Sequence, residues 1–164
     1  MFTTNVIFNF TKESDISNWR TVDDDVMGGR SSSTFLLNEK GHGEFKGNVS
    51  LDNNGGFSSV RYRFEKKEVK KHTKFVLRVK GDGKSYQFRV KSKSRDYYSF
   101  IYSFDTTTEW MTIEIPFSKM YPAFRGRKLR MSNFPGIQME EIAFLIGNKK
   151  NENFKIEIDS IELK

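Results

Sequence analysis

Two segments of alternating hydrophobicity, 74–80 and 85–91, flank the tetrapeptide Gly81-Asp82-Gly83-Lys84. A period of two places the apolar side chains of an extended segment on one face of a strand. Asp-Gly is a common tight-turn dipeptide because both residues tolerate positive φ angles. The pattern predicts an antiparallel hairpin over 74–91 and constrains the fold more than any other local feature.

The same period recurs along most of the chain. Asp52-Asn53-Asn54-Gly55-Gly56 is a second turn signal, and it predicts a hairpin that joins 42–51 to 57–64. Aromatic side chains favour strands, and the chain has 16 Phe but two Ala, at positions 123 and 143. The sequence therefore predicts an all-β fold, an antiparallel β-sandwich formed by one domain over 1–164. Further strands are expected at 97–104, 110–116, 141–147 and 154–163.

Several functional classes are excluded by what the chain does not contain. There is no Cys, so disulfides, thiolate metal centres and cysteine nucleophiles are excluded. No run approaches the roughly 18 apolar residues of a membrane span, and the first residues do not resemble a signal peptide. His42 and His72 lie in polar turns without a second ligand at metal-binding spacing. We therefore expect a cytoplasmic protein with no transmembrane segment, no cofactor and no catalytic residue.

Three consecutive carboxylates, Asp23 to Asp25, precede Val-Met-Gly-Gly at 26–29. Paired carboxylates can perform acid–base chemistry, and hard oxygen ligands suit Ca²⁺, to which Asp159 could contribute. An Asp beside two glycines more often accepts backbone N–H bonds that hold a turn. The turn interpretation is favoured for Asp24, and structural calcium remains an alternative.

Positive charge is concentrated between Arg61 and Arg95. This segment has fourteen Lys or Arg and three acidic residues, a local charge of +11 against +7 for the whole chain. Such a segment can attract phosphates, and nearby tyrosines can stack on bases. The alternative is that lysines on strand edges prevent strands from pairing with other molecules. Nucleic-acid binding is thus kept as a third functional hypothesis.

Two segments resemble the complex I intermediate-associated protein 30 family. They are Trp-Arg-Thr-Val-Asp-Asp-Asp-Val-Met-Gly-Gly-Arg-Ser at 19–31, and Phe-Lys-Gly-Asn-Val-Ser-Leu-Asp-Asn-Asn-Gly-Gly-Phe-Ser-Ser-Val-Arg at 45–61. Shorter stretches at 81–86, 110–117, 124–127 and 156–161 are also similar to the family, so the resemblance covers nearly the whole chain.

The resemblance implies a jelly roll of the galactose-binding-like type, an architecture shared by many carbohydrate-binding modules. Mitochondrial members of the family are assembly factors that hold membrane-arm intermediates of respiratory complex I, and they have no established catalytic residues. The leading hypothesis is therefore a non-catalytic protein-binding module, an assembly factor or chaperone whose partner is a membrane-complex assembly intermediate.

The family motifs identify candidate site residues in two loops. Their glycines permit conformations that a Cβ forbids, and their polar side chains can satisfy backbone groups of the loops. They form either a structural link between the loops, in which Arg61 pairs with Asp24 or another carboxylate, or a ligand or partner site. The residues are Trp19, Asp24, Asp25, Met27, Gly28, Gly29, Ser31, Asn53, Asn54, Gly55, Gly56, Phe57 and Arg61.

Carbohydrate binding on the concave sheet is the second functional hypothesis. Aromatic rings can stack on sugar faces while polar neighbours orient the hydroxyls. The candidate stacking residues are Tyr86, Tyr98, Tyr102 and Trp110, of which Trp110 is also a core candidate.

Overall fold

The computed structural model describes residues 5–24, 29–52 and 55–164, which form two antiparallel sheets packed face to face. Sheet A has the strand order β3 (Ser32–Leu37), β4 (Gly43–Val49), β13 (Glu152–Leu163), β6 (Lys74–Lys80) and β9 (Trp110–Pro116), and β1 (Asn5–Asn9) also pairs with β13. Sheet B has the order β11 (Arg127–Lys128), β10 (Tyr121–Phe124), β8 (Ser99–Asp105), β7 (Ser85–Lys91), β12 (Gln138–Ile146), β5 (Ser58–Glu68) and β2 (Trp19–Asp23). The predicted all-β antiparallel sandwich is confirmed.

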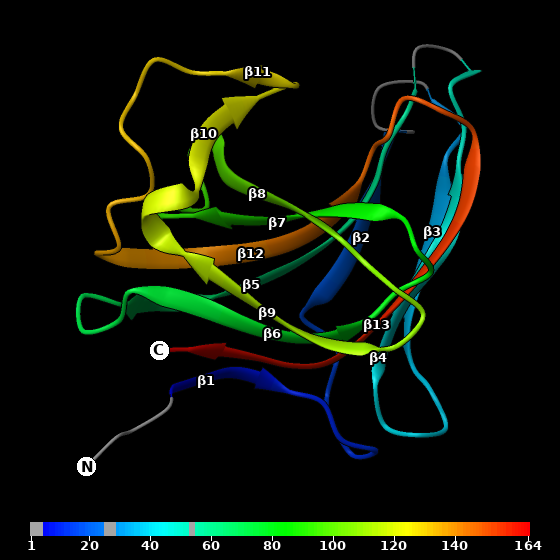
Figure 1. Cartoon of the computed structure of the whole chain (residues 1–164), viewed down its shortest axis with the longest axis horizontal. Coiled ribbons are helices and arrows are strands. Elements are labelled where there is room, and N and C mark those ends of the chain that lie inside the picture. The colour runs from blue at the N-terminus through cyan, green and yellow to red at the C-terminus, as the bar shows by residue number, and fades with distance from the viewer. Residues whose placement is uncertain (1–4, 25–28, 53–54) are drawn as a thin grey trace.

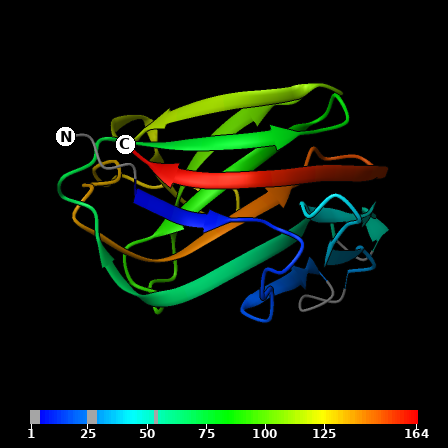
Figure 2. The ribbon, with the colours of Figure 1, turned by 90° about the horizontal axis from the view of Figure 1, so that it is seen from below.

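The long strand β13 organises sheet A. Its first half pairs with β4, and its second half pairs with β6 on one side and β1 on the other. Figure 2 shows β1, β13, β6 and β9 side by side in one layer, and Figure 1 shows β10 and β11 rising beyond β8 at one end of sheet B. A short 3₁₀ helix, Phe117–Lys119, connects β9 to β10.

Alternation along the strands builds the core between the sheets. Phe75 and Leu77 of β6 and Phe88 of β7 are fully buried, and the rings of Phe75 and Phe88 meet at a centroid distance of 5.0 Å. These two rings come from different sheets, so aromatic side chains supply much of the contact between the layers.

The two predicted hairpins are wrong. Strands β6 and β7 flank Gly81–Lys84 but belong to different sheets, and the same is true of β4 and β5. The first connection is held by Thr106, whose N–H and hydroxyl both donate to the Lys84 carbonyl at 3.1 and 2.7 Å. Both flanking strands alternate because each buries one face in the common core, a pattern that does not require them to pair.

Candidate functional site

The Asp24 carboxylate joins two loops at one end of the sandwich. Its side chain is 1% exposed. Oδ1 accepts the Ser31 N–H at 2.9 Å, while Oδ2 accepts the Ser31 hydroxyl at 2.5 Å and the Gly56 and Phe57 N–H groups at 2.6 and 3.2 Å. We call Asp24, Gly29, Ser31, Gly55, Gly56 and Phe57 the Asp24 cluster. One carboxylate thus connects two loops that are far apart in the sequence.

Two glycines leave room for this carboxylate. A Cβ at Gly29 would lie 2.3 Å from Asp24 Oδ1, and a Cβ at Gly55 would lie 2.5 Å from Oδ2. Real Cβ atoms do not approach an oxygen so closely, so neither position accepts a side chain without displacing Asp24. The glycines of the motif therefore serve the close approach of the loops to the carboxylate.

Hydrogen bonds control the ionisation of Asp24. Burial by itself raises the pKa of this carboxyl, but the hydrogen bonds from Ser31, Gly56 and Phe57 outweigh burial, and the pKa is lowered from its ordinary value of 3.8. The Ser31 hydroxyl also accepts the Ser50 N–H at 2.9 Å. These bonds link the loop of Asp24 and Ser31 to the loop of Gly56 and Phe57, which supports the interpretation of the cluster as a structural link.

The remaining residues of the two motifs lie in different places. Trp19 is 6% exposed and stacks between Tyr62 and Phe35, at centroid distances of 4.8 and 5.0 Å, so it belongs to the core. Asp25, Met27, Gly28, Asn53 and Asn54 lie outside the described residues. The bonds that Asp24 accepts come from neutral donors of the two loops, and the carboxylate that acts on Arg61 is Glu141.

A row of side chains crosses the outer face of sheet B, and three of them are arginines. Arg20 of β2 lies opposite Arg61 of β5, which lies opposite Ala143 of β12, and Ala143 lies opposite Arg89 of β7. The register continues from Arg89 to β8 and β10. We call this set the arginine row; it comprises Arg20, Arg61, Ala143, Arg89, Ile101 and Tyr121.

The neighbouring row adds more charge to the same face. Arg63 lies opposite Glu141, and Glu141 lies opposite Lys91. Arg63 Nε donates to Glu141 Oε1 at 2.7 Å, and Glu141 is 3% exposed. The two rows together hold five cations and one carboxylate.

Partial burial disfavours the charged forms of Arg61, Arg89 and Lys91. Burial, and then the positive charge of Arg61, lower the pKa of Arg89 to about 10. Burial also lowers the pKa of Arg61, where Glu141 opposes the effect and Arg63 and Arg20 add to it. The pKa of Lys91 is lowered in the same way, chiefly by burial. This face therefore holds excess positive charge that water solvates incompletely.

The proposed sugar-stacking residues do not share one surface. Tyr86 is 1% exposed, its hydroxyl donates to Asp82 Oδ1 at 3.1 Å, and burial raises its pKa, so its ring is closed to a ligand. Tyr102 and Tyr98 pack against the core and are partly buried. Trp110 is a partly exposed residue of sheet A, with its ring 4.6 Å from that of His42 and the Arg78 guanidinium 5.9 Å from it.

The basic segment between 61 and 95 is divided between the two sheets. Arg61, Arg63, Arg89 and Lys91 lie on sheet B, whereas Lys74, Arg78 and Lys80 belong to β6 of sheet A. Sequence reasoning missed Arg20 as a site residue, because strand register alone brings it beside Arg61. Alternation along β2 and β5 was the one available indication, because it places Arg20 and Arg61 on the faces opposite to the core residues Trp19 and Tyr62.

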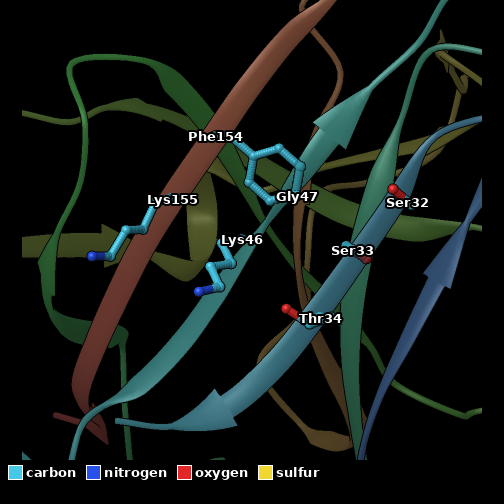
Figure 3. Close-up of a pocket in the computed structure, with 7 residues that line it drawn as sticks. All are labelled: Ser32, Ser33, Thr34, Lys46, Gly47, Phe154 and Lys155. Atoms are coloured by element: carbon cyan, nitrogen blue, oxygen red, sulfur yellow. The ribbon is translucent and has the colours of Figure 1, made fainter. Parts of the chain in front are cut away.

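A shallow hollow lies over β3, β4 and β13 of sheet A. Figure 3 shows its lining, in which Lys46 and Lys155 carry the charge. Both ammonium groups pair with Glu44, at 3.3 and 3.5 Å. Since its two cations share one carboxylate, this hollow carries less unpaired charge for a ligand than the arginine row. It is lined by Ser32, Ser33, Thr34, Lys46, Gly47, Phe154 and Lys155.

Within 5–24, 29–52 and 55–164, no three His, Asp or Glu side chains gather where they could hold a metal ion. Asp159, the proposed second calcium ligand, faces His42 Nε2 at 3.6 Å, while the Asp24 oxygens accept hydrogen bonds from loop donors. No helix in the same described part is long and apolar enough to cross a membrane.

Comparison with known proteins gives one family and one fold. The sequence model of the family described as "Complex I intermediate-associated protein 30 (CIA30)" matches residues 8–158. The mitochondrial proteins of that name from Drosophila melanogaster and Mus musculus are 27% and 24% identical, over 98% and 95% of this chain. The chain spans 63% and 55% of their lengths, less than two thirds of either.

Among solved structures, the family 11 carbohydrate-binding module of the cellulase Lic26A-Cel5E from Clostridium thermocellum has a TM-score of 0.73. It is 21% identical, and the match covers 99% of this chain and 95% of that one. At this identity the similarity establishes the fold alone, and it confirms the predicted jelly-roll class.

The mitochondrial relatives overturn the cytoplasmic location that the sequence led us to expect. That expectation depended on the lack of a secretory signal pattern, which does not distinguish the cytoplasm from an organelle.

Proposed function

The chain belongs to the complex I intermediate-associated protein 30 family, and we propose that it is a non-catalytic binding module that holds a protein partner during assembly of respiratory complex I. The observation that carries this proposal is the family match over 8–158, together with relatives of that name that align over almost the whole chain. The Asp24 carboxylate agrees with the non-catalytic part of this proposal, because it is occupied by hydrogen bonds from the two loops.

The partner surface that we propose lies over the Asp24 cluster. Leu51 is 40% exposed. Its side chain lies next to Gly56, since a Cβ placed on Gly56 would be 3.3 Å from Leu51 Cδ2. The Leu51 backbone is anchored by a hydrogen bond of 2.8 Å to Asn151 Oδ1. An apolar side chain whose backbone is already hydrogen-bonded to a neighbouring loop loses less conformational entropy when it contacts a partner.

The test is an affinity capture from solubilised mitochondrial membranes, run at low and high salt with mass spectrometry. We expect complex I subunits to be retained at high salt and to be lost with Leu51→Glu. The matched control is Ile137→Glu, because Ile137 is 49% exposed and lies beside Val69, beyond the far end of β5. Failure of the wild type to retain complex I subunits, or equal loss in both variants, would contradict the proposal.

Carbohydrate binding is the second candidate, and the similarity to a carbohydrate-binding module favours it. The outer face of sheet B is the surface to test, since Tyr86 is closed to ligands and Trp110 belongs to sheet A. A glycan array with the wild type and a Tyr121→Ala variant tests this role. Nucleic-acid binding is less favoured because the basic segment is divided between two sheets.

A further inference from the structure

We propose that the centre of the arginine row is a binding site for a phosphate group, held between Arg61 and Arg89 above Ala143. This site is distinct from the partner surface at Leu51, and it implies a small organic phosphate as ligand.

The register supplies the geometry. Arg61 and Arg89 are both paired with Ala143, one from each neighbouring strand. Adjacent strands lie about 4.8 Å apart, so the two backbones are roughly 10 Å from each other. The alanine between them carries only a methyl group and is 4% exposed, so the long side chains of its neighbours cover it. Two long guanidinium side chains on either side of a methyl group can both reach one tetrahedral anion. Arg20, next to Arg61, can approach it from a third direction.

Within the described residues the charges of these two arginines are only partly offset, since Glu141 acts on Arg61 without forming an ion pair with it. Arg89 donates from Nε and Nη2 to Gln87 Oε1, at 3.0 and 2.7 Å, and that partner is a neutral amide. The Lys91 ammonium donates to the backbone carbonyl of Asp96 at 2.6 Å. Among the residues described, no ion pair joins Arg61 or Arg89 to a carboxylate, because Glu141 pairs with Arg63. A bound anion would supply the missing counter-charge.

The chemistry favours phosphate over a carboxylate. Guanidinium groups present planar pairs of donors that match phosphate oxygens, and two of them satisfy a dianion better than a monoanion. At one end of the row β10 and β11 extend beyond β8 (Figure 1). There the Lys128 ammonium lies 5.6 Å from the centre of the Tyr121 ring.

Inorganic phosphate is the probe, titrated by calorimetry against acetate and chloride at equal ionic strength. We expect phosphate to bind more tightly than acetate or chloride. Loss of a charge-assisted hydrogen bond costs about 1.5–3 kcal/mol, so Arg61→Gln and Arg89→Gln should each weaken phosphate binding by about tenfold or more. Arg89→Lys should weaken it less, since the charge remains but the planar pair of donors is lost.

The matched control is Arg78→Gln, which removes an exposed arginine from β6 of sheet A. Melting temperatures in chloride buffer will show that each variant is folded. Equal affinity for phosphate and acetate would overturn the proposal, as would an equal loss in Arg78→Gln. A third result would also overturn it: strong, salt-sensitive binding of a single-stranded oligonucleotide that is weakened equally by Arg61→Gln and Arg78→Gln. That result would mean that the ligand is a nucleic acid that contacts both sheets.

Discussion

The Asp24 cluster and the arginine row are both charged regions set into the protein, but they treat their charge in opposite ways. Asp24 is 1% exposed, and each of its carboxylate oxygens accepts hydrogen bonds. The side chains of Arg61 and Arg89 are partly buried on either side of Ala143, and in the described part of the chain neither forms an ion pair with a carboxylate, although Glu141 acts on Arg61. A buried charge that is fully hydrogen-bonded stabilises the fold. A partly buried charge without an opposite charge beside it costs stability and remains able to bind an ion of opposite charge.

Removing the matched charge should have the largest effect. Asp24→Ala leaves the N–H groups of Ser31, Gly56 and Phe57 without their acceptor in a buried loop junction. We expect the free energy of unfolding to fall by about 3 kcal/mol, measured by urea denaturation. The control is Asp52→Ala, which removes an exposed carboxylate from the same loop. A loss below about 1 kcal/mol would show that the cluster is not a structural link.

Filling the space beside the carboxylate should have the next largest effect. In Gly55→Ala the new methyl would lie 2.5 Å from Asp24 Oδ2, so Asp24 or the loop must move. We expect a loss of about 2 kcal/mol in thermal or urea unfolding. Gly83→Ala is the comparison, because a methyl at Gly83 has nothing within 4 Å, although the φ angle of Gly83 is positive at +86°. Its loss should reflect backbone strain alone, about 1 kcal/mol.

The comparison of the two regions also shows how far sequence reasoning reaches. Alternation located most strands, and an aspartate beside glycines indicated a hydrogen-bond acceptor in a turn. Both are local patterns. The hairpin predicted over 74–91 is wrong because alternation shows that a strand has one buried face and does not identify its neighbour.

The arginine row shows the same limit at the level of the site. Arg20, Arg61 and Arg89 are separated by 41 and 28 positions in the sequence, and the register of four strands brings them together. The stacking role expected for Tyr86 failed for a related reason. Its place on the core side of β7 depends on which face of sheet B is covered, which alternation does not reveal.

Acid should weaken the Asp24 cluster selectively. Since folding lowers the pKa of Asp24, the ionised carboxylate contributes stability that is complete above its ordinary value of 3.8. That contribution is lost as the pH falls from there through the folded-state pKa. Asp24→Asn should be less stable at neutral pH and should show a smaller decline in acid. The measurement is urea denaturation of both proteins at several pH values. If the free energy of unfolding declines identically in both as the pH falls, the acid sensitivity belongs to other groups.

The smallest expected effect comes from the carboxylate beside the arginine row. Glu141→Gln keeps the shape of the side chain but removes the negative charge that pairs with Arg63, whose side chain is 52% exposed and stays solvated. The change should lower the free energy of unfolding by only about 1 kcal/mol, because Arg63 stays solvated while the face loses the buried carboxylate that offsets its cations. It also raises the excess positive charge near Arg61, so phosphate affinity should increase about two- to threefold by calorimetry.

Glu114→Gln, on β9 of sheet A, is the control. It removes a carboxylate that pairs with Lys74 and should leave the phosphate affinity unchanged. If phosphate affinity instead falls in Glu141→Gln, then Glu141 holds the arginines in position and offsets more of their positive charge than its ion pair with Arg63 indicates.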